Sequence, residues 1–221
     1  MKKRNIIIGE YDTAAQGLWT LCEWELSPAE PITNYIDVPG RIDGPLDAST
    51  ALTDGDPRYG SRTLMAVFES SEGSRLAREN RITEMINKLD GLRFNIVLPD
   101  APDLYITGRV HVARLYNDPA HASVQVTAVC DPWRFHRNET EVRLTATTEE
   151  QTVLLVNQGR RLVVPSLAVT GGSVNLSFGG ASWSLSDGDY VLPDLTLKTG
   201  TEELTYSGSG SVVITFREAV L

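Results

Sequence analysis

The chain has 221 residues, a length that suits one large or two small domains and allows a real core. Its 29 acidic and 20 basic residues give a formal charge of −9, which argues against a nucleic-acid-binding surface, because such a surface needs clustered Lys and Arg. No apolar run approaches the roughly 20 residues of a membrane span, and the opening MKKRNIII has too few apolar residues for a signal peptide. We therefore expect a soluble chain made in the cytoplasm.

The first part of the chain, up to about Arg137, is predicted to be strands with one helix among them. Short strands are expected at residues 5–8, 18–26 and 35–38. From Val38 to Gly60 the sequence is rich in turn residues, in the groups Pro39-Gly40, Asp43-Gly44-Pro45 and Asp54-Gly55-Asp56-Pro57. This loop is far longer than the two to six residues of an ordinary connection, so we expect it to have a function.

A strand and a helix follow the loop. Residues 62–70 alternate strictly, with Leu64, Ala66 and Phe68 on one face, which predicts a strand. A helix is expected to open at Gly73-Ser74 and to end near Asp90-Gly91. Its second half has an apolar stripe, whereas its first half is charged and has none, so we expect the first half to protrude or to meet another surface.

Three further strands, at residues 94–98, 105–116 and 123–129, complete this region, and the last two are expected to pair as a hairpin. The predicted first domain, residues 1–137, is a β-sandwich or small barrel with one helix packed against it. The chain after it, residues 138–221, has many Gly and Ser and no helical periodicity.

The second domain is predicted to be a two-sheet β-sandwich, so the whole chain is mainly β with one helix. Hairpin turns are expected at Gly171-Gly172 and Asp187-Gly188, and a turn at Gly208-Ser209-Gly210. The candidate strands are 142–146, 152–156, 162–169, 174–178, 181–185, 195–197, 204–206 and 211–216.

No residue pattern in the chain indicates catalysis, a metal or a cofactor. His111, His121 and His136 stand apart from other ligand residues, and no nucleophile elbow or phosphate-binding loop occurs. Cys22 and Cys130 are expected to be buried thiols rather than a disulfide or a nucleophile. The pairs Asp54-Gly55-Asp56 and Asp187-Gly188-Asp189 lack the series of oxygen ligands of a calcium loop and are interpreted as turns.

Five passages, in order, resemble the distal tail proteins of long-tailed phages that infect Gram-positive bacteria. The first is PGRIDGPLDASTALTDGDPRYGSRTLMAVFE, which begins at Pro39, and the second is the strand with Gly108-Arg109-Val110. The other three are Cys130-Asp131-Pro132-Trp133, Asn157-Gln158-Gly159 with Pro165-Ser166-Leu167 and Gly171, and the closing Val212–Arg217 with Leu221. Glu218-Ala219 departs from the Arg/Gly of the family near the end of the chain.

The resemblance implies a structural protein of a phage or prophage tail tip with no catalytic activity and no cofactor. It implies that the first domain forms a homo-oligomeric ring of six copies below the tail tube, with a channel that DNA crosses without specific binding. The second domain would be a galectin-like sandwich that faces other tail proteins, among them the receptor-binding protein, with no membrane contact. The protein would be located in the virion tail tip after assembly in the host cytoplasm.

The long loop and the charged half of the helix are the predicted subunit contacts. Arginine favours bidentate carboxylate contacts across interfaces, although Arg41 and Arg62, which bracket the loop, could equally pin it to its own domain. The candidate interface residues are Pro39, Gly40, Arg41, Gly44, Leu46, Tyr59, Arg62, Arg75 and Arg78. The candidate domain junction is Asp131, Pro132 and Trp133.

Three alternatives stay open at this stage. A carbohydrate-binding module is one, because Trp183 and Tyr190 lie near a turn of the second domain and aromatic rings bind sugar faces. Trp183 is flanked by Ser182 and Ser184 in an alternating strand, which favours a position in the core over a sugar-binding one. A hydrolase of the bacterial wall is the second alternative, and another tail-tube or baseplate hub protein is the third.

Overall fold

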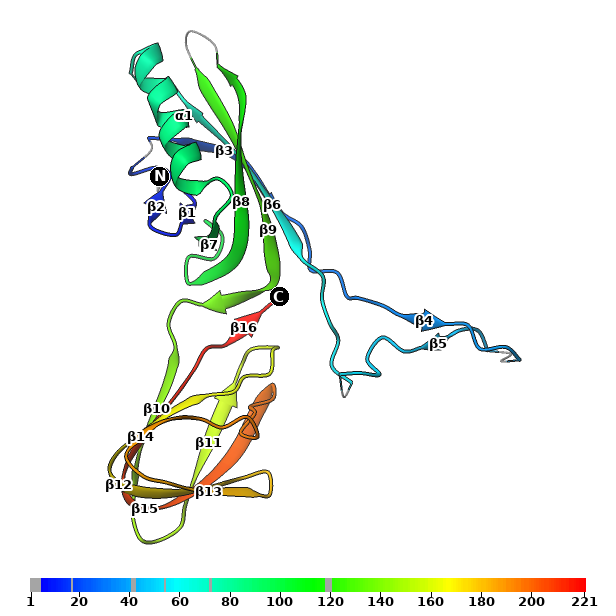
Figure 1. Ribbon diagram of the computed structural model, residues 1–221, viewed down its shortest axis with the longest axis vertical. Coiled ribbons are helices and arrows are strands. Elements are labelled where there is room, and N and C mark those ends of the chain that lie inside the picture. Colours follow the sequence, from blue (N-terminus) through cyan, green and yellow to red (C-terminus); the bar gives the residue numbers. More distant parts are fainter. Residues whose placement is uncertain (1–4, 17, 41–42, 54, 72, 118–120) are drawn as a thin grey trace. The chain divides into compact units, whose positions relative to one another are not determined.

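The structure is a computed structural model, which describes residues 5–16, 18–40, 43–53, 55–71, 73–117 and 121–221. The chain divides into two compact units, Met1–Arg134 and Phe135–Leu221, and each has its own cluster of buried apolar residues. Among the described residues there is one helix and many strands (Figure 1), so the predicted class, mainly β with one helix, is confirmed. The division falls after Arg134, whereas the sequence placed it after Arg137.

The first unit contains seven strands of an eight-stranded sheet. Its strands follow one another in the order β2-β1-β7-β8-β9-β6-β3, and every neighbouring pair in the described part is antiparallel or joined by a hairpin. The strands are β1 (Ile7–Ile8), β2 (Tyr11–Asp12), β3 (Thr20–Leu26), β6 (Arg62–Ser70), β7 (Arg93–Val97), β8 (Leu104–Asn117) and β9 (Ala122–His136).

Alternating burial explains why β6 forms where it does. Leu64, Ala66 and Phe68 are fully buried and face the core, while Thr63 is exposed on the other side. β6 lies between β9 and β3, so the backbone is paired on both sides. A strand with one apolar face against a core is the structure that this alternation predicts.

The helix α1 (Arg75–Leu89) packs on the core side of this sheet. Its apolar stripe of Ile82, Met85 and Leu89 is fully buried. The Ser74 hydroxyl caps the start of the helix by accepting a hydrogen bond from the Ala77 backbone N–H at 3.2 Å. The helix ends at Asp90, and Gly91 follows with a positive φ of 75°. The predicted bounds of the helix agree with the structure.

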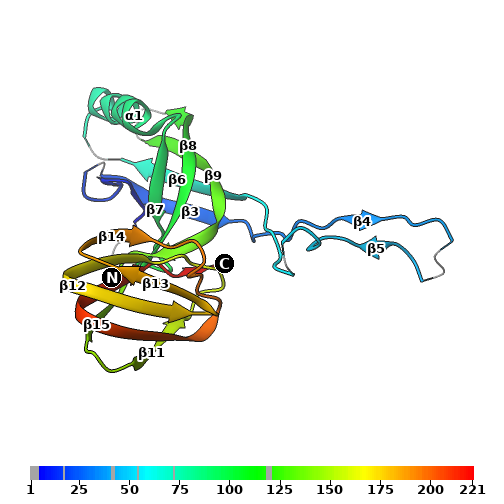
Figure 2. The same ribbon diagram turned by 60° about the horizontal axis from the view of Figure 1, so that its bottom comes forward.

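Between β3 and β6 the chain leaves the sheet as a two-stranded arm, residues 28–61. It contains β4 (Tyr35–Ile36) and β5 (Leu46–Asp47), which pair with each other in the register Tyr35–Asp47 and Ile36–Leu46. Three backbone hydrogen bonds join its two legs elsewhere, among them Ile32 N–H to the Arg58 carbonyl at 2.8 Å. Figures 1 and 2 both show the two legs running side by side.

The second unit is built on two long paired strands, β12 and β15, which pair with different short strands in the two halves of their length. One half has the order β11-β15-β12-β13, and the other half has β10-β15-β12-β14. The apolar core of this unit takes residues from both halves. The strands are β10 (Thr140–Ala146), β11 (Gln151–Asn157), β12 (Ser166–Phe178), β13 (Ala181–Leu185), β14 (Gly188–Val191), β15 (Gly200–Phe216) and β16 (Ala219–Val220).

Two predicted turns of this unit are wrong, and close approach between backbones explains both. Gly171-Gly172 lies at a bulge inside β12, and Gly208 to Gly210 lies inside β15. A Cβ on Gly172 would meet the Ser209 carbonyl oxygen at 1.9 Å, and one on Gly208 would meet the Ser173 carbonyl at 2.3 Å. These glycines let the two long strands bend and stay in contact, a use of glycine that resembles a turn in sequence.

The other corrections are local. Asp187-Gly188 is no hairpin turn, because β13 and β14 each pair with β12 rather than with each other. Residues 195–197 are not a strand; Leu197 only forms an isolated β-bridge with Val163. Cys22 is exposed, in contrast to the prediction, since the β3 register shifts between Leu21 and Glu23; Cys130 is buried as expected.

The departure at Glu218-Ala219 fits the end of the second unit. Ala219 is fully buried, and its backbone lies so close to Gly159 that a Cβ there would be 2.7 Å away. The Glu218 carboxylate accepts hydrogen bonds from the Gln158 backbone N–H at 2.6 Å and from the Thr140 hydroxyl at 3.3 Å. Both positions are therefore used in holding the last turn.

Candidate functional site

Many of the exposed large apolar side chains of the first unit lie on the arm. Every residue in 31–40 and 43–47 is exposed. The exposed fraction reaches 60% for Tyr35 and 89% for Leu52. Most large apolar side chains of a monomer belong to its core, so a group of exposed ones on one segment indicates a contact surface. The exposed large apolar residues of the arm are Ile32, Tyr35, Ile36, Val38, Leu46 and Leu52.

Cross-strand pairing gives the two sides of the arm different chemistry. Ile36 is directly opposite Leu46, so these two side chains share one side. Tyr35 is opposite Asp47, and this pair lies on the other side, because successive residues of a strand point in opposite directions. One side of the paired region is thus apolar, and the other combines an aromatic ring with a carboxylate.

Acidic residues dominate the charge of the arm. Residues 28–61 contain six acidic residues (Glu30, Asp37, Asp43, Asp47, Asp54 and Asp56) and only two basic ones (Arg41 and Arg58). The Asp47 carboxylate accepts hydrogen bonds from the Ser49 hydroxyl at 2.5 Å and from its backbone N–H at 2.9 Å. These bonds lower the pKa of Asp47 from its ordinary value of 3.8, so this carboxylate is charged at neutral pH.

Arg62 lies at the root of the arm and is almost fully buried. Its Nε donates to the Ser27 carbonyl at 2.7 Å, while the Ser27 hydroxyl accepts from the Thr63 backbone N–H at 2.7 Å. The Arg62 Nη1 is buried and has no hydrogen-bond partner among the described residues. Burial, together with the nearby charge of Arg134, lowers the pKa of Arg62. Arg62 therefore ties the two ends of the arm to the sheet.

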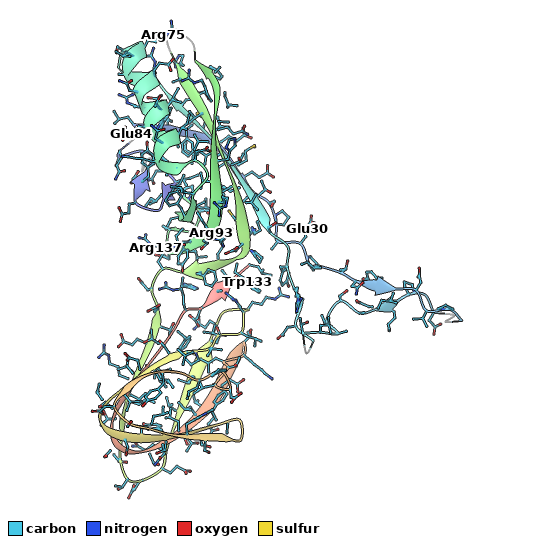
Figure 3. All side chains as sticks on the ribbon, in the orientation of Figure 1. Glu30, Arg75, Glu84, Arg93, Trp133 and Arg137 are labelled. Carbon is cyan, nitrogen blue, oxygen red and sulfur yellow. The ribbon has the colours of Figure 1, made fainter. Side chains whose placement is uncertain are left out.

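Aromatic and charged contacts of β9 complete the root. The rings of Tyr59 and Trp133 meet edge to face, with centroids 5.5 Å apart and planes at 78°. Asp131 accepts a hydrogen bond from Arg93 Nη2 at 2.5 Å. Figure 3 labels Trp133 and Arg93 at this end of the first unit. The predicted junction residues Asp131, Pro132 and Trp133 directly precede Arg134, the last residue of the first unit, and all three lie within β9.

The two helix residues predicted for the interface differ in exposure. Arg75 is exposed at the start of α1, where Figure 3 labels it. Arg78 is buried, and its Nη1 donates to the Gly73 carbonyl at 2.6 Å. The first half of the helix therefore does not protrude as a whole, since Arg78 is used inside the unit, while Arg75 is exposed.

The structure brings some of the predicted residues together and separates others. Tyr59 and Trp133 are in contact at the root of the arm, and Arg62 begins β6 there. Pro39, Gly40, Gly44 and Leu46 are exposed along the arm, where Gly40 and Gly44 have the positive φ of turn glycines. Arg75 and Arg78 lie on the helix instead. Arg41 lies outside the described residues.

Sequence reasoning named Leu46 and placed Val38 and Leu52 in the loop predicted for subunit contacts, but it gave Ile32 no role and interpreted Tyr35 and Ile36 only as part of a strand. All three are exposed in the structure. The signal that could have found them is apolar residues recurring inside a turn-rich, acidic segment, where a core cannot form. Such residues have no place to be buried within their own chain.

Metal and membrane features are absent from the described part of the chain. No cluster of three or more His, Cys, Asp or Glu side chains capable of holding a metal ion occurs among the described residues. The helix in the described ranges is too short and too polar to cross a membrane.

Comparison with known proteins finds a solved structure with the same fold over the whole chain. No family model matches the chain, and no curated protein matches it. Among solved structures, SPP1 Dit (gp 19.1), described as a paradigm of the hub adsorption apparatus in phages that infect Gram-positive bacteria, superimposes with a TM-score of 0.69. The match covers 100% of both chains at 16% identity, so it shows the distal tail protein fold, as the sequence predicted.

A second solved structure, from the disulfide-linked pili of Bacillus endospore appendages, covers 38% of this chain and 87% of that chain at 18% identity. Its TM-score of 0.27 is too low to carry any argument.

Proposed function

We propose that this protein is a structural component of a phage or prophage tail tip. In this proposal six copies form a ring that joins the tail tube to the receptor-binding apparatus and leaves a channel for DNA. The observation that carries the proposal is the full-length match of the fold to a tail hub protein. The partners are further copies of the chain, the tail tube, the tail-tip protein and the receptor-binding protein, and the location is the virion tail tip.

The arm supports the ring. A closed ring with one kind of subunit needs a head-to-tail contact, in which one patch fits a different patch on the neighbour. The arm supplies one such patch, because its apolar residues are exposed in the single chain. A two-stranded ribbon of this kind is marginally stable alone, and covering its apolar side by a neighbour would stabilise it.

The acidic charge supports passage of DNA without specific binding. A net charge of −9 offers phosphates no general attraction, so a duplex could pass through the channel without being held. The role is structural rather than catalytic, with no cofactor in the proposal.

Solution mass tests the ring. Six copies of 24.2 kDa amount to about 145 kDa, and light scattering of the purified chain should show this mass, with a central hole in negative-stain images. Deletion of Pro45–Gly55 should leave both units folded, as measured by circular dichroism, and should abolish the 145 kDa species. A chain that is monomeric at every concentration and absent from purified tails would contradict the proposal.

Carbohydrate binding by the second unit is the second candidate function, and one observation favours it. Asn175, Ser177 and Ser184 line an open groove of about 480 Å³ on β12 and β13. Such hydroxyl and amide groups can hydrogen-bond to sugars. Trp183 lines the same groove while it packs against the core of this unit, whereas Tyr190 packs against the core and does not line the groove. Pull-down of the full chain with wall polysaccharide, compared with the Asn175→Ala variant, tests this function.

A further inference from the structure

The arm needs a receiving surface on the neighbouring copy, and its own chemistry describes that surface. One side of the arm is apolar at Ile36 and Leu46, and the charge along it is acidic. A complementary surface must therefore combine exposed apolar groups with basic ones. The arm residues stay exposed in the single chain, so their own copy does not provide this cover.

The start of α1 and the end of β8 form such a surface. α1 runs antiparallel to β8, because Asp90 at the helix end contacts His111, with Oδ1 and Nδ1 2.7 Å apart, while Glu79 near the helix start pairs with Arg114 at 2.6 Å. Leu76 on the helix and Tyr116 on the strand therefore follow at the same end of the two elements.

Apolar and basic groups occur together at this end. Leu76 is 70% exposed and Tyr116 is 47% exposed. Arg75 is exposed one residue before Leu76, and it lies one helical turn from Glu79, which pairs with Arg114. Because Arg114 is paired with Glu79 and the Tyr116 hydroxyl donates to the Glu69 carboxylate at 2.6 Å, Arg75 supplies the basic charge that faces a partner here. We call Arg75, Leu76, Arg114 and Tyr116 the receiving surface.

The charge of α1 gives an independent reason for an acidic partner. The first turn of the helix contains no acidic residue and begins with Arg75. The N-terminus of a helix carries a partial positive charge, so a cation there is unfavourable for the isolated helix, whereas an anion is favoured. An acidic segment of a neighbour placed against this turn would compensate the charge of Arg75 and the partial positive charge of the helix N-terminus.

We propose that the arm of one copy docks on the receiving surface of the next copy. This inference rests on the proposed function, since it names the partner surface of the same ring contact. Ile36 and Leu46 pack near Leu76 and Tyr116, and the acidic residues Asp37 and Asp43 approach Arg75. The contact is head to tail, because the arm and the receiving surface are different parts of the first unit, and it can close into a ring.

A cysteine pair tests the contact directly. Leu46→Cys and Leu76→Cys are combined in a Cys22→Ser background, because Cys22 is exposed and Cys130 is buried. Mild oxidation should give dimers and higher species on a non-reducing gel. The matched control pairs Leu46→Cys with Leu154→Cys, an exposed position of the second unit, and should give no ladder. The proposal is overturned if the first pair stays monomeric, or if the two pairs cross-link equally.

Charge reversal tests the electrostatic half of the contact. Asp37→Arg with Asp43→Arg on the arm, or Arg75→Glu on the helix, should each raise the protein concentration needed for assembly by about tenfold or more. All three substitutions in one chain should recover assembly, because every contact then again joins opposite charges. A triple variant that assembles no better than the arm variant overturns the proposal.

These results separate the two proposals. If the unsubstituted chain forms no ring, the proposed function fails, and the cross-link still reports whether the arm meets the receiving surface. If rings form but the cross-link and the charge rescue both fail, the ring stands and the receiving surface is wrong.

Discussion

The arm and the sheet that it leaves use apolar residues in opposite ways. In β6 every second residue from Leu64 to Phe68 is fully buried against the helix-covered core. In the arm the apolar residues are just as large, yet all six are exposed. The difference lies in the neighbours: β6 has a strand on each side, while β4 and β5 have only each other. Apolar residues without a core in their own chain indicate a surface that another chain covers.

The largest expected effect on stability comes from truncating a buried side chain of β6. Phe68→Ala removes a fully buried ring and should lower the free energy of unfolding of the first unit by about 3–5 kcal/mol. Leu52→Ala removes a side chain that is 89% exposed and should change the stability of the monomer by less than about 0.5 kcal/mol. Urea denaturation combined with hydrogen exchange resolves the first unit. Equal losses in both variants would contradict the contrast.

Arg62 lies where the two regions join, and its removal should have the next largest effect. Arg62→Ala deletes the buried donor to the Ser27 carbonyl and should cost about 1–3 kcal/mol. Hydrogen exchange at the Ser27 and Thr63 amides, which join the two ends of the arm, should become faster.

The matched control for this variant is Arg58→Ala, since Arg58 is an exposed arginine of the arm itself. It should leave both amides protected. If the Ser27 and Thr63 amides exchange at the same rate in Arg62→Ala as in Arg58→Ala, Arg62 does not tie the arm to the sheet. Its role is then at the subunit contact instead.

Periodicity decided which parts of the fold could be predicted. β6 and α1 were predicted with the correct bounds, because alternation and a clean apolar stripe both require a core on one side. The glycines of β12 and β15 were misinterpreted as turns, since a glycine needed for close backbone approach looks the same in sequence as one needed for a turn. Only the partner strand, far away in the sequence, distinguishes the two.

The site was predicted less completely than the fold. The sequence located the arm through its turn residues, and it named Leu46 and Arg75, which are exposed. It could not tell that Arg78 is buried while Arg75 is exposed, because the charged half of the helix has no periodic pattern. It also assigned no contact to Ile32, Tyr35 or Ile36, which precede the predicted loop, since exposure depends on whether a neighbouring strand exists.

A smaller loss of stability is expected at the start of α1, which packs on the sheet. Ser74→Ala removes the hydroxyl that accepts from the Ala77 N–H, and it should cost about 1 kcal/mol. Ser71→Ala changes an exposed serine outside the helix and serves as the control. Thermal unfolding followed by circular dichroism measures both variants. The capping role is excluded if Ser71→Ala is the more harmful of the two.

The smallest effect is expected inside the arm, where pH alters one hydrogen-bonded turn. Because the bonds from Ser49 lower the pKa of Asp47 in the folded arm, they stabilise the arm above pH 3.8, the ordinary value, and this stabilisation is lost as the pH falls through the lowered pKa. Carboxyl NMR titration should give Asp47 a pKa below 3.8, and Ser49→Ala should return it toward that value. The protection factor of the Ala48 N–H, which bonds to the Asn34 carbonyl at 2.8 Å, should fall at low pH in the unsubstituted chain once the pH dependence of the intrinsic exchange rate is taken into account. An unchanged Asp47 titration in Ser49→Ala would show that this turn contributes nothing to the order of the arm, which would then depend on the neighbouring copy alone.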